Sequence, residues 1–298
     1  MAPGSVSTAP DRALLRRRLG QFALACVLIT WPPWAALAAA GADVDRGPAV
    51  AVFTLAACGP TLAALAMRLR HGRERARRRV RPSLAWPLLS LLLGAAPALL
   101  VSALLNWDGL EELPRHAAAV AAGAGGPAGV LAYTLLAGPL AEEFGWRGYV
   151  QPRLRTALGR AATAALLGAA WAVWHVPLFF LEGTEQSRTG LVTLQGALFF
   201  ATFLPLSYII LFVCEHLEGG VWAAVLVHAA WNASSALLPE LGDAGHLLRS
   251  GAVLALAAAV AAYWRGRPDG PQGRGRTPAG ISAGGPRRTG PGPGRGPG

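Results

Sequence analysis

The sequence predicts an all-α membrane protein with about eight transmembrane helices in one bundle. Hydrophobic residues make up 53% of the 298 residues and charged residues only 14%, against roughly 25% charged residues in ordinary soluble domains. Apolar segments close to the ~20 residues that cross a bilayer recur along the chain. Together these features favour a polytopic membrane protein over a soluble helical fold.

Eight apolar segments have spanning length. They cover residues 19–40, 48–67, 84–105, 128–146, 161–181, 191–214, 221–238 and 247–264. We therefore expect an eight-helix membrane domain over residues 19–264, after a basic N-terminal segment, 1–18. The tail, 265–298, is rich in Gly, Pro and Arg and poor in large apolar residues, which predicts disorder.

Two of these segments have features that bear on their assignment. The first follows three consecutive arginines and resembles a secretory signal, but its 22 residues exceed the roughly 7–15 of a signal-peptide core. We expect it to be a retained helix. The second and fourth segments each contain a Gly-Pro pair, Gly59-Pro60 and Gly138-Pro139, which neighbouring helices can accommodate.

The arginines predict how the chain lies in the membrane. If the N-terminus is cytoplasmic and all eight segments cross, 23 of the 27 arginines fall on the cytoplasmic side. The other four are Arg46, Arg115, Arg188 and Arg249. Short cytoplasmic loops are enriched in Arg and Lys. The sequence therefore predicts that both the N- and the C-terminus are cytoplasmic.

The net charge of +11 does not predict a nucleic-acid partner. The charge lies in short loops beside apolar segments, where anionic lipid headgroups are the nearest counter-ions, so we expect the lipid bilayer as partner and no nucleic acid. The basic residues are all Arg and the chain is rich in Ala, Gly and Pro, a composition typical of GC-rich genomes. We expect a multi-pass protein of a bacterial plasma (inner) membrane.

Ionisable residues near the end of the fourth segment are the first candidate site. Residues 142–147 read EEFGWR and follow a run, 128–140, without any charge. A charged side chain at the centre of a membrane helix costs roughly 2.5–3.5 kcal/mol. Glu143 and Arg147 have the i, i+4 spacing of a helical ion pair, while Glu142 is rotated by about 100°. The alternative is a structural salt bridge at a helix end.

Two further segments carry polar side chains. The fifth contains Trp171 and His175, and the seventh contains His228 and Asn232, which lie one turn apart on one helical face. Taken alone, each of these side chains could simply form a hydrogen bond between two helices. Together with the fourth segment they predict a shared interior cavity lined by polar groups.

The candidate site residues are predicted to lie at different depths in the membrane. At about 1.5 Å per residue, Glu142 lies roughly 6–9 Å, His228 about 10–12 Å and His175 about 20 Å from the cytoplasmic ends of their segments. Convergence then requires an offset between helices, or a kink at Pro139 or Pro177.

The residue types suit activation of water for amide hydrolysis. A Glu shielded from solvent can act as general base near neutral pH, and a neighbouring His can hold the attacking water. A second His and an Asn amide can donate to the developing oxyanion, which is worth about 2.7–4 kcal/mol per donor in one protease. The sequence has no plausible Ser-His-Asp or Cys-His set and no HExxH zinc helix.

The order and spacing of these motifs resemble the CPBP intramembrane proteases. That family includes the type II CAAX prenyl endopeptidases and the Abi-like bacteriocin-processing proteins, and its pattern is EExxxR, then commonly FxxxH, then HxxxN. The corresponding residues here are Glu142-Glu143 with Arg147, Trp171 with His175, and His228 with Asn232. The match covers about residues 125–235, and the Trp in place of Phe is a mild departure.

The resemblance implies a cavity open toward the cytoplasm and the membrane. It implies Glu142 as general base, His175 as the residue that positions the water, and His228 with Asn232 as the oxyanion hole. Glu143 and Arg147 would support the site.

The resemblance leaves cofactor and substrate open. Glu142, His175 and His228 could hold zinc with an open position, or the Glu/His/Asn set could work without metal. The expected substrate is a peptide or membrane-anchored protein. The family name suggests CAAX-type C-terminal processing, whereas a bacterial origin disfavours a prenylated substrate. The alternative function is a non-catalytic multi-span protein, either a transporter or a bacteriocin-immunity scaffold, because intramembrane Glu, His and Arg also build proton relays.

Overall fold

The structure, a computed structural model, describes residues 12–72, 84–136, 138–239 and 242–269. Residues 1–11, the basic loop from 73 to 83 and the predicted disordered tail from 270 onward lie outside these ranges. The α-helices are α1 (Arg12–Ala39), α2 (Ala49–Ala57), α3 (Gly59–His71), α4 (Trp86–Leu105), α5 (Glu112–Gly123), α6 (Gly126–Leu136), α7 (Pro139–Gly145), α8 (Gln151–Leu154), α9 (Arg160–Trp174), α10 (Glu185–Thr189), α11 (Leu194–Glu215), α12 (Gly220–Leu237) and α13 (Asp243–Trp264). Three short elements join them: η1 (Trp107–Gly109), the π-helix η2 (Trp146–Val150) and η3 (Val176–Phe180).

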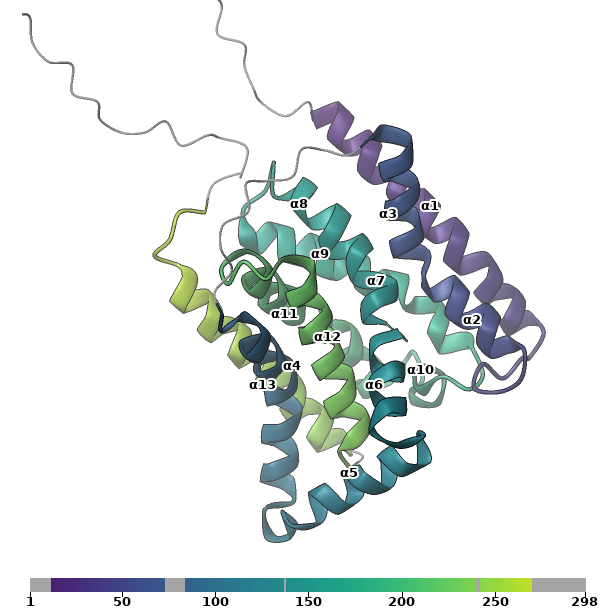
Figure 1. Ribbon diagram of the computed structural model, residues 1–298, viewed down its shortest axis with the longest axis vertical. Helices are drawn as coiled ribbons and strands as arrows, with labels where there is room; N and C mark the ends of the chain where they lie inside the picture. The colour runs from purple at the N-terminus through teal and green to yellow at the C-terminus, as the bar shows by residue number, and fades with distance from the viewer. Residues whose placement is uncertain (1–11, 73–83, 137, 240–241, 270–298) are drawn as a thin grey trace, which may run out of the picture.

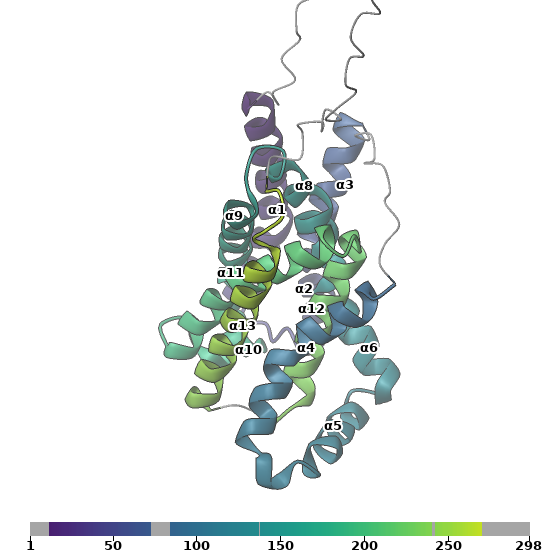
Figure 2. The ribbon, with the colours of Figure 1, turned by 90° about the vertical axis from the view of Figure 1, so that its left-hand side faces the viewer.

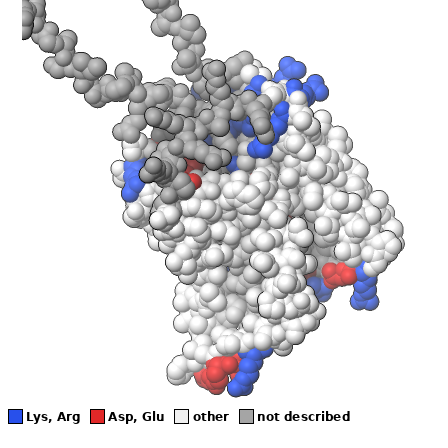
Figure 3. All heavy atoms as spheres, viewed as in Figure 1, with Lys and Arg blue, Asp and Glu red and all other residues white. Residues whose placement is uncertain are grey.

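The long helices run back and forth between two opposite ends of one bundle (Figure 1). The "arginine end", where α1 begins and α13 ends, carries Arg16, Arg68, Arg153, Arg160 and Arg267. The "loop end" is formed by residues 40–48, α5, α10 and the start of α13. Figure 2 shows the same two ends from the side, with α5 farthest from the start of α1. On the face drawn in Figure 3, the described charged side chains gather at the two ends, and the band between them is uncharged.

Among the described residues, five helical stretches are long and apolar enough to cross a membrane. They are α1, α4, residues 160–180, α11 and α13. Two bent pairs, α2 with α3 and α5 with the stretch 126–154, raise the number to seven if each pair is one span. The remaining predicted span is α12, whose mean hydropathy is lowered by His228 and Asn232. An all-helical multi-span fold is therefore confirmed, while the count of eight and the cytoplasmic termini stay predictions.

The fourth segment extends beyond its predicted end at Trp146. After α7 the chain continues through η2 and α8 as far as Leu154, which adds eight residues, or roughly 12 Å. Glu142 therefore lies about 18 Å from the end of its helical stretch, since twelve residues separate it from Leu154. The predicted difference in depth between Glu142 and His175 came mainly from this wrong boundary.

Glycines allow close packing of the two helices that carry site residues. A Cβ on Gly94 of α4 would lie 2.3 Å from the backbone oxygen of Val227 on α12. A Cβ on Gly145 of α7 would lie 2.4 Å from the backbone oxygen of Pro60 on α3. Both distances are too short for a real side chain, so these contacts fix α12 against α4 and α7 against α3.

Candidate active site

Glu142 lies in the first turn of α7, next to a break in the helix. Gly138, which has a non-helical backbone conformation, precedes α7, and Pro139 opens this helix at a position where its missing N–H costs nothing. The Glu142 amide donates to the Gly138 carbonyl oxygen at 2.8 Å. The side chain is buried, and its Oε2 accepts a 2.5 Å hydrogen bond from the indole N–H of Trp171. Its other oxygen, Oε1, faces the space beside Gly138.

The missing side chain of Gly138 marks a space surrounded by three polar groups. A Cβ at this position would lie 3.2 Å from Asn232 Nδ2, 3.3 Å from His228 Nε2 and 3.4 Å from Glu142 Oε1. A small group placed beside Gly138 is thus within reach of a carboxylate, an imidazole and an amide at once. This is the arrangement that a reacting carbonyl and a water molecule require.

His228 is held by a buried ion pair. Its Nδ1 lies 2.8 Å from Glu143 Oε1, which also accepts a 3.0 Å hydrogen bond from Arg147 Nη1. The side chains of Glu143 and Arg147 are both 0% exposed, as a pair at the predicted i, i+4 spacing. Arg147 also donates to Ser207 Oγ on α11 at 3.3 Å and covers the Trp171 ring, with 4.1 Å between the guanidinium carbon and the ring centroid.

This ion pair determines what the other His228 nitrogen can do. Because the Glu143 carboxylate accepts from Arg147, the Nδ1 of His228 is assigned as a donor to the same oxygen. The Nε2 atom then accepts a hydrogen bond in the neutral ring and donates one only in the doubly protonated ring. Glu143 is the counter-ion that a doubly protonated ring requires, so the pair allows His228 to serve as an oxyanion donor.

His175 follows the last residue of α9, where the chain turns into η3. Its Nδ1 donates to the Trp171 carbonyl oxygen at 2.8 Å, which leaves Nε2 as the acceptor of the neutral ring. The ring packs among aromatic side chains, with centroids 4.8 Å from both Trp174 and Phe203. His175 can therefore accept a hydrogen bond from a water molecule but is held away from other polar partners.

All four predicted catalytic side chains line one cavity of about 700 Å³. Aromatic side chains form much of its wall: Trp34, Phe53, Tyr133, Trp171, Trp174, Phe179, Phe199, Phe203 and Trp231. Glu143 and Arg147, by contrast, lie behind it and contact it through His228 and Trp171. The structure thus brings Glu142, His175, His228 and Asn232 to one place, and their catalytic roles stay a prediction.

The cavity reaches the loop end of the bundle, where its lining includes Asp45, Glu185, Arg188 and Arg249. The resemblance implies an opening toward the cytoplasm, and the arginine distribution predicts cytoplasmic termini. Both described chain ends, Arg12 and Asp269, lie at the arginine end. The two expectations therefore conflict, because the opening and the chain ends are at opposite ends of the bundle.

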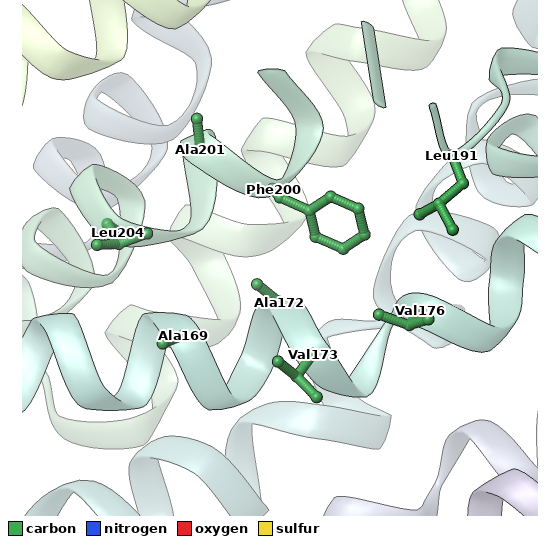
Figure 4. Close-up of a pocket in the computed structure, with 8 residues that line it drawn as sticks. All are labelled: Ala169, Ala172, Val173, Val176, Leu191, Phe200, Ala201 and Leu204. Atoms are coloured by element: carbon green, nitrogen blue, oxygen red, sulfur yellow. The ribbon is translucent and has the colours of Figure 1, made fainter. Parts of the chain in front are cut away.

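A second, open cavity of about 540 Å³ lies between α9 and the α11 region (Figure 4). Its lining is entirely apolar and includes Ala172, Val176 and Phe200. Without a polar or ionisable side chain it offers no group for catalysis.

The described residues show no three-ligand metal site. Among the described ranges, no three His, Cys, Asp or Glu side chains lie in a position to share a metal ion. The candidate set of Glu142, His175 and His228 therefore lacks the geometry of a three-ligand zinc site. We derive no catalytic step through a metal.

Two contributors to the site are missed by sequence patterns alone. Trp171 departs only mildly from the Phe of the family pattern, yet its N–H is the donor to Glu142. Gly138 stands in the sequence only as part of a Gly-Pro pair, yet its lack of a side chain leaves the space between the polar groups. One feature of the sequence could have indicated the role of Trp171. Unlike the Phe of the family pattern, it carries an N–H donor, and it lies one turn before His175 in a segment with few other donors.

Comparison with known proteins shows which family the region that carries the site is similar to. Residues 124–234 match the family model "Type II CAAX prenyl endopeptidase Rce1-like". This region is therefore similar to the Rce1-like family. The match confirms the resemblance predicted from the three motifs, and it covers all six residues of the predicted site.

A curated relative also aligns with part of this chain. "CAAX prenyl protease 2" from the archaeon Methanococcus maripaludis is 29% identical over 132 residues, which are 44% of this chain and 48% of the relative. The chain thus matches about half the length of that protein.

Proposed function

We propose that the chain is an intramembrane endopeptidase that hydrolyses peptide bonds of membrane-associated proteins or peptides. The single observation that carries this proposal is the space beside Gly138, which Glu142 Oε1, His228 Nε2 and Asn232 Nδ2 all approach to 3.4 Å or less. The Rce1-like match over residues 124–234 supports the same reaction class.

In the proposed mechanism, Glu142 is the general base. Its Oε1 takes a proton from a water molecule that the Nε2 of His175 holds in place, and the water oxygen attacks the scissile carbonyl carbon. The new C–O bond puts negative charge on the carbonyl oxygen, to which His228 Nε2 and Asn232 Nδ2 donate. The C–N bond then breaks, and Glu142 returns the proton to the leaving amine.

The supporting residues fix the reacting ones in position. Trp171 orients the Glu142 carboxylate by its hydrogen bond to Oε2, so that Oε1 is the oxygen left to accept the proton. Glu143, itself held by Arg147, fixes the ring of His228 through Nδ1. Such second contacts commonly set the orientation and tautomer of a reacting imidazole.

The aromatic wall of the cavity suits a peptide with apolar side chains near the bond that is cut. The relative's name refers to a CAAX prenyl protease. For this chain, CAAX-type C-terminal processing is one form that the proposed activity can take.

The test is cleavage of an internally quenched peptide library by the purified protein in detergent. We expect Glu142→Ala and His228→Ala each to abolish cleavage, and Glu111→Ala, a carboxylate between η1 and α5 outside the cavity lining, to leave it unchanged. Full turnover by both site variants would eliminate the endopeptidase proposal. It would favour a non-catalytic membrane protein instead.

A further inference from the structure

Ser207 of α11 lies behind the site and contacts it through Arg147. It is the only polar side chain among the buried residues of α11, a helix that the structure describes along its whole length. The exposed fraction of Ser207 is 1%, and its Oγ accepts a 3.3 Å hydrogen bond from Arg147 Nη2. The three motifs lie on other segments, so no sequence pattern assigns this serine a role.

Arg147 is held from three directions by side chains of three helices. Its Nη1 donates to Glu143 Oε1 on α7 at 3.0 Å, and its guanidinium carbon lies 4.1 Å from the centroid of the Trp171 ring on α9. The hydrogen bond from Nη2 to Ser207 is the third contact and the one that comes from α11. Among the described residues the Nε atom of Arg147 has no hydrogen-bond partner. The bond to Ser207 therefore fixes the rotation of the guanidinium.

The ion pair between Arg147 and Glu143 uses only one oxygen of the carboxylate. Arginine and carboxylate groups frequently pair through two parallel hydrogen bonds. Here only Glu143 Oε1 takes part, while Oε2 is buried and has no hydrogen-bond partner among the described residues. Ser207 binds Nη2, the nitrogen beside Nη1 from which a parallel second bond would come. The serine thus competes with Glu143 for this nitrogen and holds the pair in its one-bond arrangement.

The one-bond arrangement matters because Glu143 Oε1 also binds His228. The distance from this oxygen to His228 Nδ1 is 2.8 Å, so the place of the oxygen sets the place of the ring. Rotation of the guanidinium into a two-bond pair would turn the carboxylate and move Oε1 relative to α12. The opposite ring nitrogen, Nε2, would then shift from its place beside Gly138, where it lies 3.3 Å from the position of an added Cβ.

We propose that Ser207 is a positioning residue, which holds His228 Nε2 at the oxyanion through Arg147 and Glu143. This inference rests on the proposed endopeptidase function, in which His228 donates to the carbonyl oxygen. Ser207 does not line the cavity, so it acts only through the other side chains of this chain of contacts. The site therefore requires the hydroxyl at position 207 and not merely a side chain of that volume.

Ser102 of α4 provides a matched control. It also has an exposed fraction of 1% and lies in a helix long and apolar enough to cross a membrane, but its Oγ has no hydrogen-bond partner among the described residues. Ser207→Ala and Ser102→Ala therefore remove the same atom from equally buried places. Ser207→Thr retains the hydroxyl. Ser207→Cys keeps the volume with only a weak acceptor, and it replaces Ser207→Ala if that variant does not fold.

The first measurement reads the His228 ring by nuclear magnetic resonance and requires no turnover. The rings of all six histidines are labelled with ¹⁵N in the full chain in detergent, and His228→Gln identifies the His228 signals by their loss. We expect Ser207→Ala to shift these signals or split them into two sets. We expect Ser102→Ala and Ser207→Thr to leave them in place.

The second measurement is cleavage of the quenched peptides by the same variants. We expect Ser207→Ala to lower kcat roughly tenfold with little change in KM, the order expected for loss of one hydrogen bond to a charged group. Ser207→Thr should recover most of this loss, and Ser102→Ala should leave kcat unchanged.

Two results would overturn the proposal. Unchanged His228 signals in Ser207→Ala would show that the serine does not position the ring, whatever happens to cleavage. An equal loss of kcat in Ser207→Ala and Ser102→Ala would show that both act through packing. If the unsubstituted protein cleaves no peptide, the endopeptidase proposal fails, while the ¹⁵N signals still decide whether Ser207 positions His228.

Discussion

Two groups of buried charges lie at different depths in the same bundle, and they are built differently. At the arginine end, Arg155 donates from Nε to both oxygens of Glu215, at 3.1 Å each. Arg160 donates to the backbone oxygens of Trp264, Arg267 and Pro268 and lies over the Trp264 ring. These side chains join helix ends to each other and to the segment after α13.

The group around Glu142 directs polar atoms into a cavity instead. Glu142, His175 and His228 each use one atom to contact the protein, which leaves Oε1 and two Nε2 atoms on the cavity side. Burial of charged side chains therefore does not by itself identify a catalytic site. A site is indicated where each side chain is fixed by one contact and keeps a second atom for a ligand.

Replacing a proposed oxyanion donor should cause a large loss of rate. Asn232→Ala is expected to lower kcat by about 10²–10³-fold, as loss of one oxyanion-hole donor does in a well-studied protease. Cleavage kinetics in detergent measure the effect. Asn106→Ala, which removes the other asparagine, a C-cap at the end of α4, should keep kcat within about twofold. Equal losses in both variants would contradict the assignment.

Replacing an arginine of the other group should change stability and not rate. Arg160→Ala is expected to lower the free energy of unfolding by about 3 kcal/mol, because it removes a buried cation and leaves its carbonyl and carboxylate partners without their contacts to it. Thermal unfolding in detergent measures the effect, and kcat at low temperature should be unchanged. The exposed Arg265→Ala is the control. A large loss of kcat without loss of stability would break the distinction between the two groups.

Removing the indole donor to Glu142 should have a smaller, kinetic effect. Trp171→Phe is expected to lower kcat about tenfold with little change in KM, since the ring is nearly retained while the hydrogen bond to Oε2 is lost. Trp174→Phe is a matched control, because Trp174 is also buried at the cavity and its N–H has no hydrogen-bond partner among the described residues. If the two variants behave alike, Trp171 acts through packing alone.

The sequence predicts the helices better than their contacts. The length of the apolar segments predicts an all-helical multi-span fold, which the structure confirms, and the i, i+4 spacing predicts the Glu143–Arg147 ion pair that the structure shows. The continuation of the fourth segment to Leu154 was not predicted, because η2 and α8 contain polar residues that lower hydropathy without ending the helix. α5 was not predicted either, since it has only 12 residues and lies at the loop end.

Tertiary features of the site were beyond the reach of sequence patterns. The hydrogen bond between Trp171 and Glu142 joins residues 29 positions apart, on α9 and α7. Glu142 and Trp171 meet only through the tertiary packing of these helices, which includes the close contact of Gly145 with Pro60. The end at which the cavity opens depends on α10 and on the loop before α2. Neither segment has a hydrophobic periodicity from which its position could be predicted.

Two glutamates, one from each group, provide the most direct test of the central claim that Glu142 activates water. Glu142→Gln and Glu215→Gln are compared for peptide cleavage and for unfolding temperature in detergent. We expect Glu142→Gln to lower kcat by at least about 10²–10⁴-fold without a fall in unfolding temperature. We expect Glu215→Gln to lower the unfolding temperature while kcat stays within about twofold. Full cleavage activity of Glu142→Gln would contradict the central claim.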